Sequence, residues 1–449
     1  MEEVERNIRE IEELIINGKD EVLFRLLKEL HPADIADIIE HLDEEEKRKV
    51  FSLLDIDTAS DVIVEISKPA REEILESIKK DRLSKIVDEM PSDDATDFLA
   101  DLPENEAKII LARIDKEDSE EVRMLSKYGD DTAGGIMQAE MVSVNQDATV
   151  KEAIREIRSL SEEVEDLHNV FVVDREHRLT GVLPLRKLIL AQPDTRISRI
   201  MESPIKVDVH MDQEEVARVF EKYDIVSVPV VDEKEKLVGR ILVDDIVDVI
   251  QEEASEDFLR MGGTEVEDLV YSNQIFKISR FRLPWLLTNL LGGIVTGYLL
   301  WMFKMTLHEI LALVTFIPVI TGMGGNLGTQ SSAIMVRGFA IGKIDLANLW
   351  RILSKEVLIG LMAGTVCGAL VGLIALFWHG EPILGLAVGL AMVLAMTAAS
   401  IIGVLAPSFF KTMKIDPAIA SGPFVTTTND ITGISIYLGT ATLLLKILT

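Results

Sequence analysis

Apolar residues recur with a strict period of 12 between residues 26 and 115. Each repeat reads apolar-apolar-x-x-apolar, as in Ile38-Ile39-x-x-Leu42. Positions i, i+1 and i+4 share one face of a helix, so each repeat predicts one short amphipathic helix. A short helix cannot bury its apolar face alone, whereas a stack of such helices can. The pattern therefore predicts an acidic all-α solenoid, a superhelical N-domain, over residues 1–130.

A longer duplication follows, with copies at about 136–197 and 199–253. The pair Ile-Met at 136–137 recurs at 200–201, and Phe-Val-Val-Asp at 171–174 recurs as Pro-Val-Val-Asp at 229–232. Each copy predicts a helix, two short β-branched strands and a second helix. This α+β arrangement over 131–253 resembles a tandem pair of CBS domains, a regulatory module that often senses adenosine nucleotides or ions. ATP is therefore a candidate ligand of the pair.

Five apolar segments of about 20 residues or more, long enough to cross a bilayer, follow an acidic linker helix at 254–282. They predict an α-helical transmembrane domain over 283–449, in contact with membrane lipid. The segments are residues 283–303, 309–336, 357–378, 382–409 and 418–445. Most flanking Lys and Arg residues, including Arg282, Arg337 and Lys411, fall on one side, which the positive-inside rule assigns to the cytosol. The N-terminus also lacks the basic-then-apolar order of a signal peptide. We therefore expect a cytosolic N-terminus and an external C-terminus in the plasma (inner) membrane.

Charge divides the chain at the same point. Residues 1–282 hold 38 basic and 70 acidic side chains, a net charge of −32, and residues 283–449 hold 8 and 6, a net charge of +2. Such an acidic region attracts cations and repels nucleic acid, so no nucleic-acid partner is expected. The single cysteine, Cys367, excludes an intrachain disulfide.

One carboxylate stands apart within the apolar segments. Asp430 lies well inside the fifth segment, whereas Glu309, Glu356, Glu381 and Asp416 are expected at segment ends or in loops. A carboxylate inside a membrane is costly and indicates a polar pathway or a partner. Hydroxyl and amide oxygens surround Asp430 in the sequence, and oxygen ligands suit Mg²⁺. The alternative is a structural carboxylate paired with a basic residue.

The second apolar segment contains a polar, glycine-rich stretch, Thr-Gly-Met-Gly-Gly-Asn-Leu-Gly-Thr-Gln-Ser-Ser at 321–332. It lacks the Gly-Lys-Ser/Thr ending of a phosphate-binding loop. Two interpretations stay open for it. One is a broken or tightly packed helix beside a water-filled path, and the other is helix packing alone.

The order of a helical acidic domain, a CBS pair, an acidic linker helix and membrane spans resembles the MgtE family of magnesium transporters. The motifs that carry the resemblance are Asp-Asp-Thr-Ala-Gly-Gly-Ile-Met at 130–137, Gly-Gly-Asn-Leu-Gly-Thr-Gln at 324–330 and Asn-Asp-Ile-Thr-Gly at 429–433. The resemblance implies a homodimer with one pore, selective for Mg²⁺, in which Asp430 binds the hydrated ion.

The resemblance also implies that cytosolic Mg²⁺ closes the pore by bridging acidic residues of the N-domain, the CBS pair and the linker helix. The matching positions are Asp61, Asp93, Asp97, Asp212, Glu214, Asp224, Asp245, Asp248, Glu253, Glu256, Asp257 and Asp416. The pore-lining candidates are Asn326, Gly422, Thr426 and Asn429. Gly422 departs from the family pattern, in which some members place a pore-facing Asn there.

Three alternatives to a gated Mg²⁺ channel stay open at this point. A carrier of Co²⁺ or Mn²⁺ would use similar ligands, although oxygen ligands do not favour a soft metal. A CBS-regulated membrane nucleotide sensor would need no Asp430. A membrane enzyme would need a catalytic arrangement, and His308, His379 and Cys367 suggest none, so no enzyme activity is expected.

Overall fold

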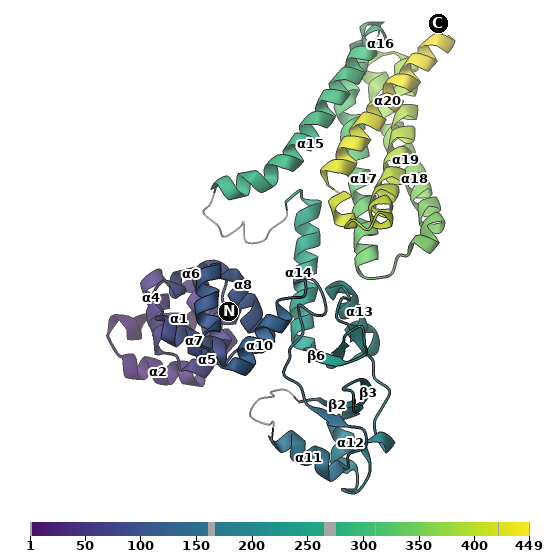
Figure 1. Ribbon diagram of the computed structural model, residues 1–449. Coiled ribbons are helices and arrows are strands. Elements are labelled where there is room, and N and C mark those ends of the chain that lie inside the picture. The colour runs from purple at the N-terminus through teal and green to yellow at the C-terminus, as the bar shows by residue number, and fades with distance from the viewer. Residues whose placement is uncertain (1, 160–166, 265–274, 310, 421, 449) are drawn as a thin grey trace. The chain divides into compact units, whose positions relative to one another are not determined.

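The structure is a computed structural model of the 449-residue chain. It describes every residue except 1, 160–166, 265–274, 310, 421 and 449 (Figure 1). Two compact units make up the chain, Met1–Ile250 and Gln251–Thr449.

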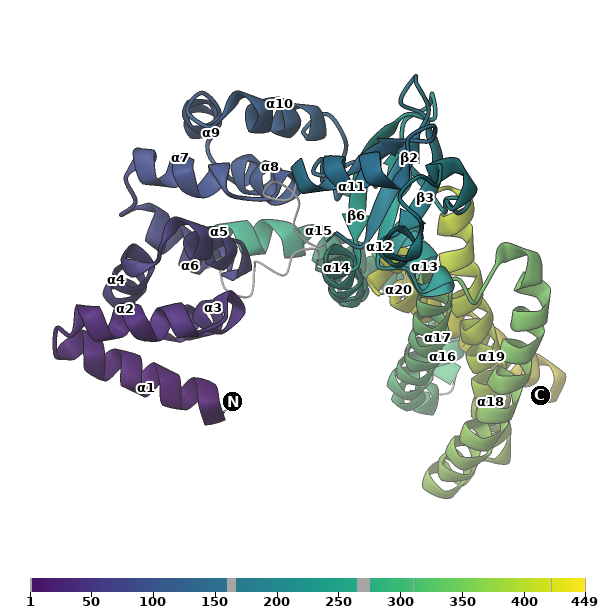
Figure 2. The same ribbon diagram turned by 90° about the horizontal axis from the view of Figure 1, so that it is seen from below.

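Short helices fill the first part of the first unit (Figure 2). In chain order they are α1 (Glu2–Ile16), α2 (Asp20–Glu29), α3 (Pro32–His41), α4 (Glu44–Leu53), α5 (Ile56–Glu65), α6 (Lys68–Leu75), α7 (Lys80–Asp88), α8 (Ser92–Asp101), α9 (Glu104–Leu111) and α10 (Lys116–Leu125). From α2 to α10 each helix begins 12 residues after the one before it. The predicted helical period is therefore confirmed.

The helices pack in an alternating order that makes a solenoid. Helix α3 packs on α5, α5 on α7 and α7 on α9, whereas α4 packs on α6 and α8 on α10. The repeated apolar positions form the core between them, and Ile38, Ile39 and Val62 are fully buried there. A stack of this kind buries the stripe that one short helix would leave in water.

Two three-stranded sheets form the rest of the first unit. The first contains β1 (Ser143–Asn145), β2 (Asn169–Val173) and β3 (Leu179–Pro184), with α11 (Val150–Ser159) and α12 (Leu185–Leu190). The second contains β4 (Val207–Asp208), β5 (Ser227–Val231) and β6 (Leu237–Leu242), with α13 (Gln213–Tyr223) and the start of α14 (Val243–Met261). The sequence predicted two strands per copy. It missed β1 and β4, which pair in parallel with β2 and β5, because two or three residues are too short to show alternation.

The two copies exchange their leading segments. Gln138 forms a bridge with Arg240 of β6, and Glu202 forms the corresponding bridge with Val182 of β3. The repeated methionines explain the glycines at 181 and 239, because a β-carbon added to Gly239 would lie 2.8 Å from the sulfur of Met137. The duplicated Ile-Met pair thus joins each copy to the sheet of the other.

Long helices dominate the second unit. They are α15 (Ile275–Met302), α17 (Ile317–Ala340), α18 (Leu349–His379), α19 (Pro382–Thr412) and α20 (Pro423–Leu448), with a short α16 (Lys304–Glu309) and the 3₁₀ turns η3 (Leu311–Phe316), η4 (Leu346–Asn348) and η5 (Pro417–Ala420). By length and hydropathy, 4 segments of the described chain could cross a membrane: Ile278–Met302, Leu311–Ala340, Leu346–His379 and Pro382–Thr412. Helix α20 has 26 residues but falls outside this set.

Four glycines of α18 recur every four residues and so share one helix face, and all four meet α19 at close range: Gly360, Gly364, Gly368 and Gly372. A β-carbon on Gly364 would lie 2.9 Å from the Cα of Val393, and one on Gly368 would lie 2.5 Å from the carbonyl oxygen of Gly389. Small residues allow two membrane helices to approach this closely, and the resulting van der Waals contact is a main source of their association.

Candidate metal centres and pore

Carboxylates of the helical stack and of the CBS pair meet in the first unit, in what we call the α8–α14 cluster. Its members are Asp61, Glu65, Asp93, Asp94, Asp97, Glu140, Asp244, Asp245 and Asp248. Asp93 is the most enclosed, at 7% exposed, and its Oδ1 has no hydrogen-bond partner among the described residues. A buried carboxylate oxygen without a donor is costly, so this arrangement favours a bound cation.

The start of α8 explains why Asp93 is held there. The Glu140 carboxylate accepts hydrogen bonds from the backbone N–H of Ser92 at 2.8 Å and from its hydroxyl at 2.7 Å. The backbone N–H of Ala139 donates to the same hydroxyl at 2.8 Å. A negative group is favoured at a helix N-terminus, where backbone N–H groups are free. These bonds tie the start of α8 to the segment that leads into the CBS pair.

Burial and mutual repulsion raise the pKa values within the cluster. Burial, followed by the charges of Asp94 and Asp245, raises the pKa of Asp93 well above its usual range. Burial and the neighbouring Asp97 and Glu65 raise the pKa of Asp94 to about 7, although Arg71 opposes the shift. Burial and the charges of Asp244, Asp94 and Asp248 likewise raise the pKa of Asp245 to about 7. A divalent cation would relieve this repulsion.

The sequence analysis missed Asp94, which lies among Asp61, Glu65 and Asp97. The Ser-Asp-Asp start of α8 was the available signal.

Three predicted residues of the CBS pair lie in a different element, α13 and its caps. There Asp212 accepts the N–H of Glu214 at 3.0 Å, Glu214 pairs with Arg218 at 2.7 Å, and Asp224 ends the helix with a φ of 50°. These contacts belong to the ends and surface of α13, and a metal-binding role for the three residues stays a prediction.

A second group, the linker cluster, lies in the second unit and consists of Glu253, Glu256, Asp257 and Asp416 with Arg260 and Arg337. The Arg260 guanidinium forms ion pairs with Glu256 and with Asp416. Burial and the charges of Asp416 and Glu253 raise the pKa of Asp257 to about 6, while Arg260 and Arg337 oppose the shift. This group therefore contains its own cations.

The unusual Gly422 lies beside the end of α14. A β-carbon there would press on the carbonyl oxygen of Met261, and one on Gly263 would lie 3.2 Å from Pro423. The close approach of two backbones accounts for a glycine at 422 in this chain.

The pore candidates are spread over α17 and α20. Asp430 is half-buried on α20, and Thr426, one turn before it, donates its hydroxyl to the Pro423 carbonyl at 3.1 Å. Asn429 is 2% exposed, whereas Asn326 on α17 is exposed. The structure therefore brings Asp430, Thr426 and Asn429 onto one helix and leaves Asn326 at the surface of the single chain.

The expectation that Glu356 lies at a segment end was wrong. Glu356 lies within α18 and within the third candidate span, at 8% exposed. The hydroxyl of Ser331 on α17 donates to its carboxylate at 2.7 Å, and Ser400 on α19 donates to its backbone carbonyl at 3.1 Å. The predicted third segment begins at residue 357, whereas α18 already begins at Leu349.

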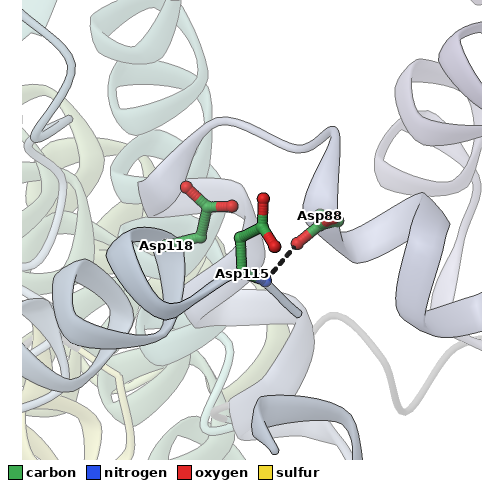
Figure 3. A group of neighbouring side chains, drawn as sticks. All are labelled: Asp88, Asp115 and Asp118. Carbon is green, nitrogen blue, oxygen red and sulfur yellow. Dashed lines mark hydrogen bonds between the residues drawn. The ribbon is translucent and has the colours of Figure 1, made fainter. Parts of the chain in front are cut away.

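A third acidic group, Asp88, Asp115 and Asp118, lies within the helical stack (Figure 3). Their ligand atoms lie within 4.8 Å of one another, and the backbone N–H of Asp115 donates to Asp88 at 2.7 Å. Burial and the charge of Asp88 raise the pKa of Asp118 to about 6. Asp115 is exposed, so water can screen this group more than the α8–α14 cluster.

Three protein-family models match successive parts of the chain. The MgtE model, a divalent cation transporter, matches residues 317–440, the MgtE intracellular N domain matches 30–131, and CBS domains match 133–194 and 197–252. The magnesium transporter MgtE of Thermus thermophilus is 38% identical over 97% of this chain and 98% of its own length. The chain belongs to the MgtE family.

Two further comparisons agree with this assignment. The magnesium transporter MgtE of Bacillus subtilis is 33% identical over 96% of this chain and 95% of its own length. A solved structure of the cytosolic domain of the Mg²⁺ channel MgtE in complex with ATP is 35% identical, with a TM-score of 0.52 over 54% of this chain and 99% of that one. The MgtE family consists of membrane ion transporters, and the chain is accordingly a multi-pass membrane protein and not an enzyme.

Proposed function

We propose that this MgtE-family chain is a Mg²⁺-selective channel or facilitative transporter whose ion passes Asp430. The half-buried carboxylate on α20, in the unit that contains the candidate spans, carries the proposal. A carboxylate in that environment needs a cation or a polar path. A hydrated Mg²⁺ satisfies it well, because Mg²⁺ keeps several waters and binds through one or two carboxylates.

Helix α20 is the proposed fifth span. At 26 residues it is roughly 39 Å long, which exceeds the ~30 Å hydrocarbon core. A polar run from Thr426 to Asp430 lies in its first half, and a mainly apolar stretch follows from Ile431 to Leu448. A polar run is expected where a helix faces a water-filled path instead of lipid. With five spans, a cytosolic N-terminus and an external C-terminus follow for a protein of the plasma membrane.

Cytosolic Mg²⁺ is the proposed inhibitor, and the α8–α14 cluster is its proposed sensor. Asp93, Asp94 and Asp245 supply oxygen ligands in a half-buried to buried setting, and Asp93 has an oxygen without a donor among the described residues. Asp61, Asp97 and Asp248 contribute further negative charge. Asp245 and Asp248 lie in the first half of α14, and the second half carries Glu253, Glu256 and Asp257 of the linker cluster. The proposed sensor and the linker cluster therefore share one helix.

Two partners are part of the proposal. A homodimer fits the long exposed apolar faces of α15 and α18, which lipid and a second copy would share. ATP is proposed as a ligand of the CBS pair, since the related cytosolic domain was solved with ATP.

The test is ion flux into liposomes that contain only the purified chain. We expect Mg²⁺ uptake that falls as Mg²⁺ on the cytosolic side rises. Asp430→Asn should fold and dimerise normally but lose most of this flux, and Asp430→Glu should keep part of it because the charge remains. Normal dimer with near-normal uptake in Asp430→Asn would reject the proposed ion site. Faster Co²⁺ or Mn²⁺ uptake than Mg²⁺ uptake would reject the proposed selectivity.

A further inference from the structure

Asn429, the neighbour of Asp430, is enclosed in an unusual way. At 2% exposed, its side chain has no hydrogen-bond partner for either Oδ1 or Nδ2 among the described residues. It lies directly on Gly328 of α17. A β-carbon added to Gly328 would lie 3.0 Å from the Cγ of Asn429, closer still to its Nδ2, and 3.2 Å from the Ala399 carbonyl oxygen of α19. Only a residue without a side chain leaves room for this amide.

A second contact holds α20 from another side. The Thr427 hydroxyl donates to the Oδ1 of Asn289 on α15 at 3.0 Å. Each residue turns a helix by about 100°, so Thr427 and Asn429 point roughly 200° apart. The two contacts, one on α15 and one on α17, therefore define the rotation of α20 about its own axis.

The direction of Asp430 follows from this rotation. Asp430 is about 100° beyond Asn429 around the helix, so adjacent side chains of this pair do not share a face. This agrees with the exposure of the two residues, because Asn429 is buried and Asp430 is half-buried. A turn of α20 that released Asn429 from Gly328 would move the Asp430 carboxylate by the same angle.

From these contacts we propose that Asn429 is a positioning residue for Asp430, seated on Gly328, and not an ion ligand itself. The last glycine of the Gly-Gly-Asn-Leu-Gly motif then has a specific role, which is to accept the Asn429 amide. This inference rests on the proposed function, because it assigns how the Asp430 carboxylate is aimed at the ion path.

The experiment is a double-mutant cycle in liposomes with Gly328→Ala and Asn429→Ala. In Gly328→Ala the added methyl group collides with the amide, so Mg²⁺ flux should fall by about tenfold or more, as expected when a reacting group is misplaced by a fraction of an ångström to an ångström. Asn429→Ala alone should lower the Mg²⁺ flux by a smaller factor than Gly328→Ala does. The double variant should recover to near the level of Asn429→Ala, because the amide that the methyl group meets most closely is gone and the remaining contact, with the Ala399 carbonyl oxygen at 3.2 Å, needs only a small shift.

Gly439→Ala is the matched control. Gly439 is also a helical glycine of the second unit, and a β-carbon there would meet no described atom within 4 Å. Its flux should equal that of the unchanged protein. A second readout does not depend on flux. In a Cys367→Ala background, Asp430→Cys should react with a water-soluble thiol reagent. Gly328→Ala should change the rate of that reaction, whereas Asn326→Cys, at an exposed position of α17, should react at the same rate with and without Gly328→Ala.

The outcomes separate the inference from the proposed function. Absence of Mg²⁺ flux in both the unchanged protein and Gly439→Ala would reject the proposed function. Normal flux in those two, together with normal flux in Gly328→Ala, would overturn the inference. A double variant as inactive as Gly328→Ala, or an unchanged rate at position 430, would also overturn it.

Discussion

The α8–α14 cluster and the linker cluster are both acidic, but they differ in how their charge is balanced. In the α8–α14 cluster Asp94 and Asp245 raise the pKa of Asp93, Asp94 also raises the pKa of Asp245, and Asp93 has an oxygen without a donor among the described residues. In the linker cluster Arg260 forms ion pairs with Glu256 and Asp416. The two clusters are therefore expected to differ in how strongly they bind a metal ion.

The difference indicates which cluster depends on Mg²⁺. Carboxylates that face one another need a mobile cation, whereas carboxylates paired with an arginine already have a tethered one. We therefore expect Mg²⁺ to act mainly on the α8–α14 cluster, and Arg260 to compete with Mg²⁺ for the carboxylates of the linker cluster.

The largest expected effect is on the stability of a fragment of residues 1–250 at pH 8. Mg²⁺ at about ten times its dissociation constant contributes about 1.4 kcal/mol, which would raise the melting temperature by about 3–6 °C. NaCl of equal ionic strength should raise it far less. The measurement is circular dichroism on heating.

The double variant Asp93→Asn/Asp245→Asn tests whether the α8–α14 cluster is responsible for the stabilisation by Mg²⁺. We expect the double variant to lose the Mg²⁺ response and to melt at a higher temperature without metal, since repulsion is removed. A retained response to Mg²⁺ would place the sensor elsewhere.

Lowering the pH should stabilise the 1–250 fragment in part as Mg²⁺ does. Because the pKa values of Asp94 and Asp245 are raised to about 7, protonation of these carboxyls favours the folded state. That stability is fully present below the unfolded pKa of about 3.8 and is lost as the pH rises through about 7. Without Mg²⁺ the 1–250 fragment should therefore melt at a lower temperature at pH 8 than at pH 5. If the melting temperature of Asp93→Asn/Asp245→Asn falls by the same amount between pH 5 and pH 8, groups outside the cluster are responsible for the pH dependence.

Arg260→Gln tests the tethered cation of the linker cluster. A half-buried ion pair of this kind is worth about 1 kcal/mol, or a factor of about five in an equilibrium. Without Arg260, Glu256 and Asp416 should turn to Mg²⁺, so protection of the linker from protease should become about fivefold more dependent on Mg²⁺. Arg260→Lys should lie between, because the charge remains but the two-pronged geometry is lost. A Mg²⁺ dependence identical to that of the unchanged chain would show that Arg260 does not compete.

The smallest effect is expected at the third acidic group. Asp115 is exposed beside Asp88 and Asp118, so Asp115→Asn should change the melting temperature of the 1–250 fragment by no more than about 1–2 °C, with or without Mg²⁺. A loss of the Mg²⁺ response as large as that in Asp93→Asn/Asp245→Asn would make this group the sensor instead.

The amino-acid sequence alone specified the short helices of the first unit and the family of this protein. The 12-residue period specified where nine helices begin, because the position of a buried stripe depends only on residue spacing. The same is true of the glycines on α18, whose four-residue spacing marks a packing face. The motifs at 130–137, 324–330 and 429–433 were sufficient to recognise the family, which the 38% identical relative established.

Which polar residues meet depended on how the folded elements pack. The sequence predicts Glu356 at a segment end, whereas it lies inside α18 and accepts a hydrogen bond from Ser331, 25 residues away. Asp94 was not among the predicted ligands, and it lies among Asp61, Glu65 and Asp97. The contact of Asn429 with Gly328 joins two helices about 100 residues apart in the chain. A periodic pattern reports the face that a residue occupies, but its partner across that face depends on how the elements pack.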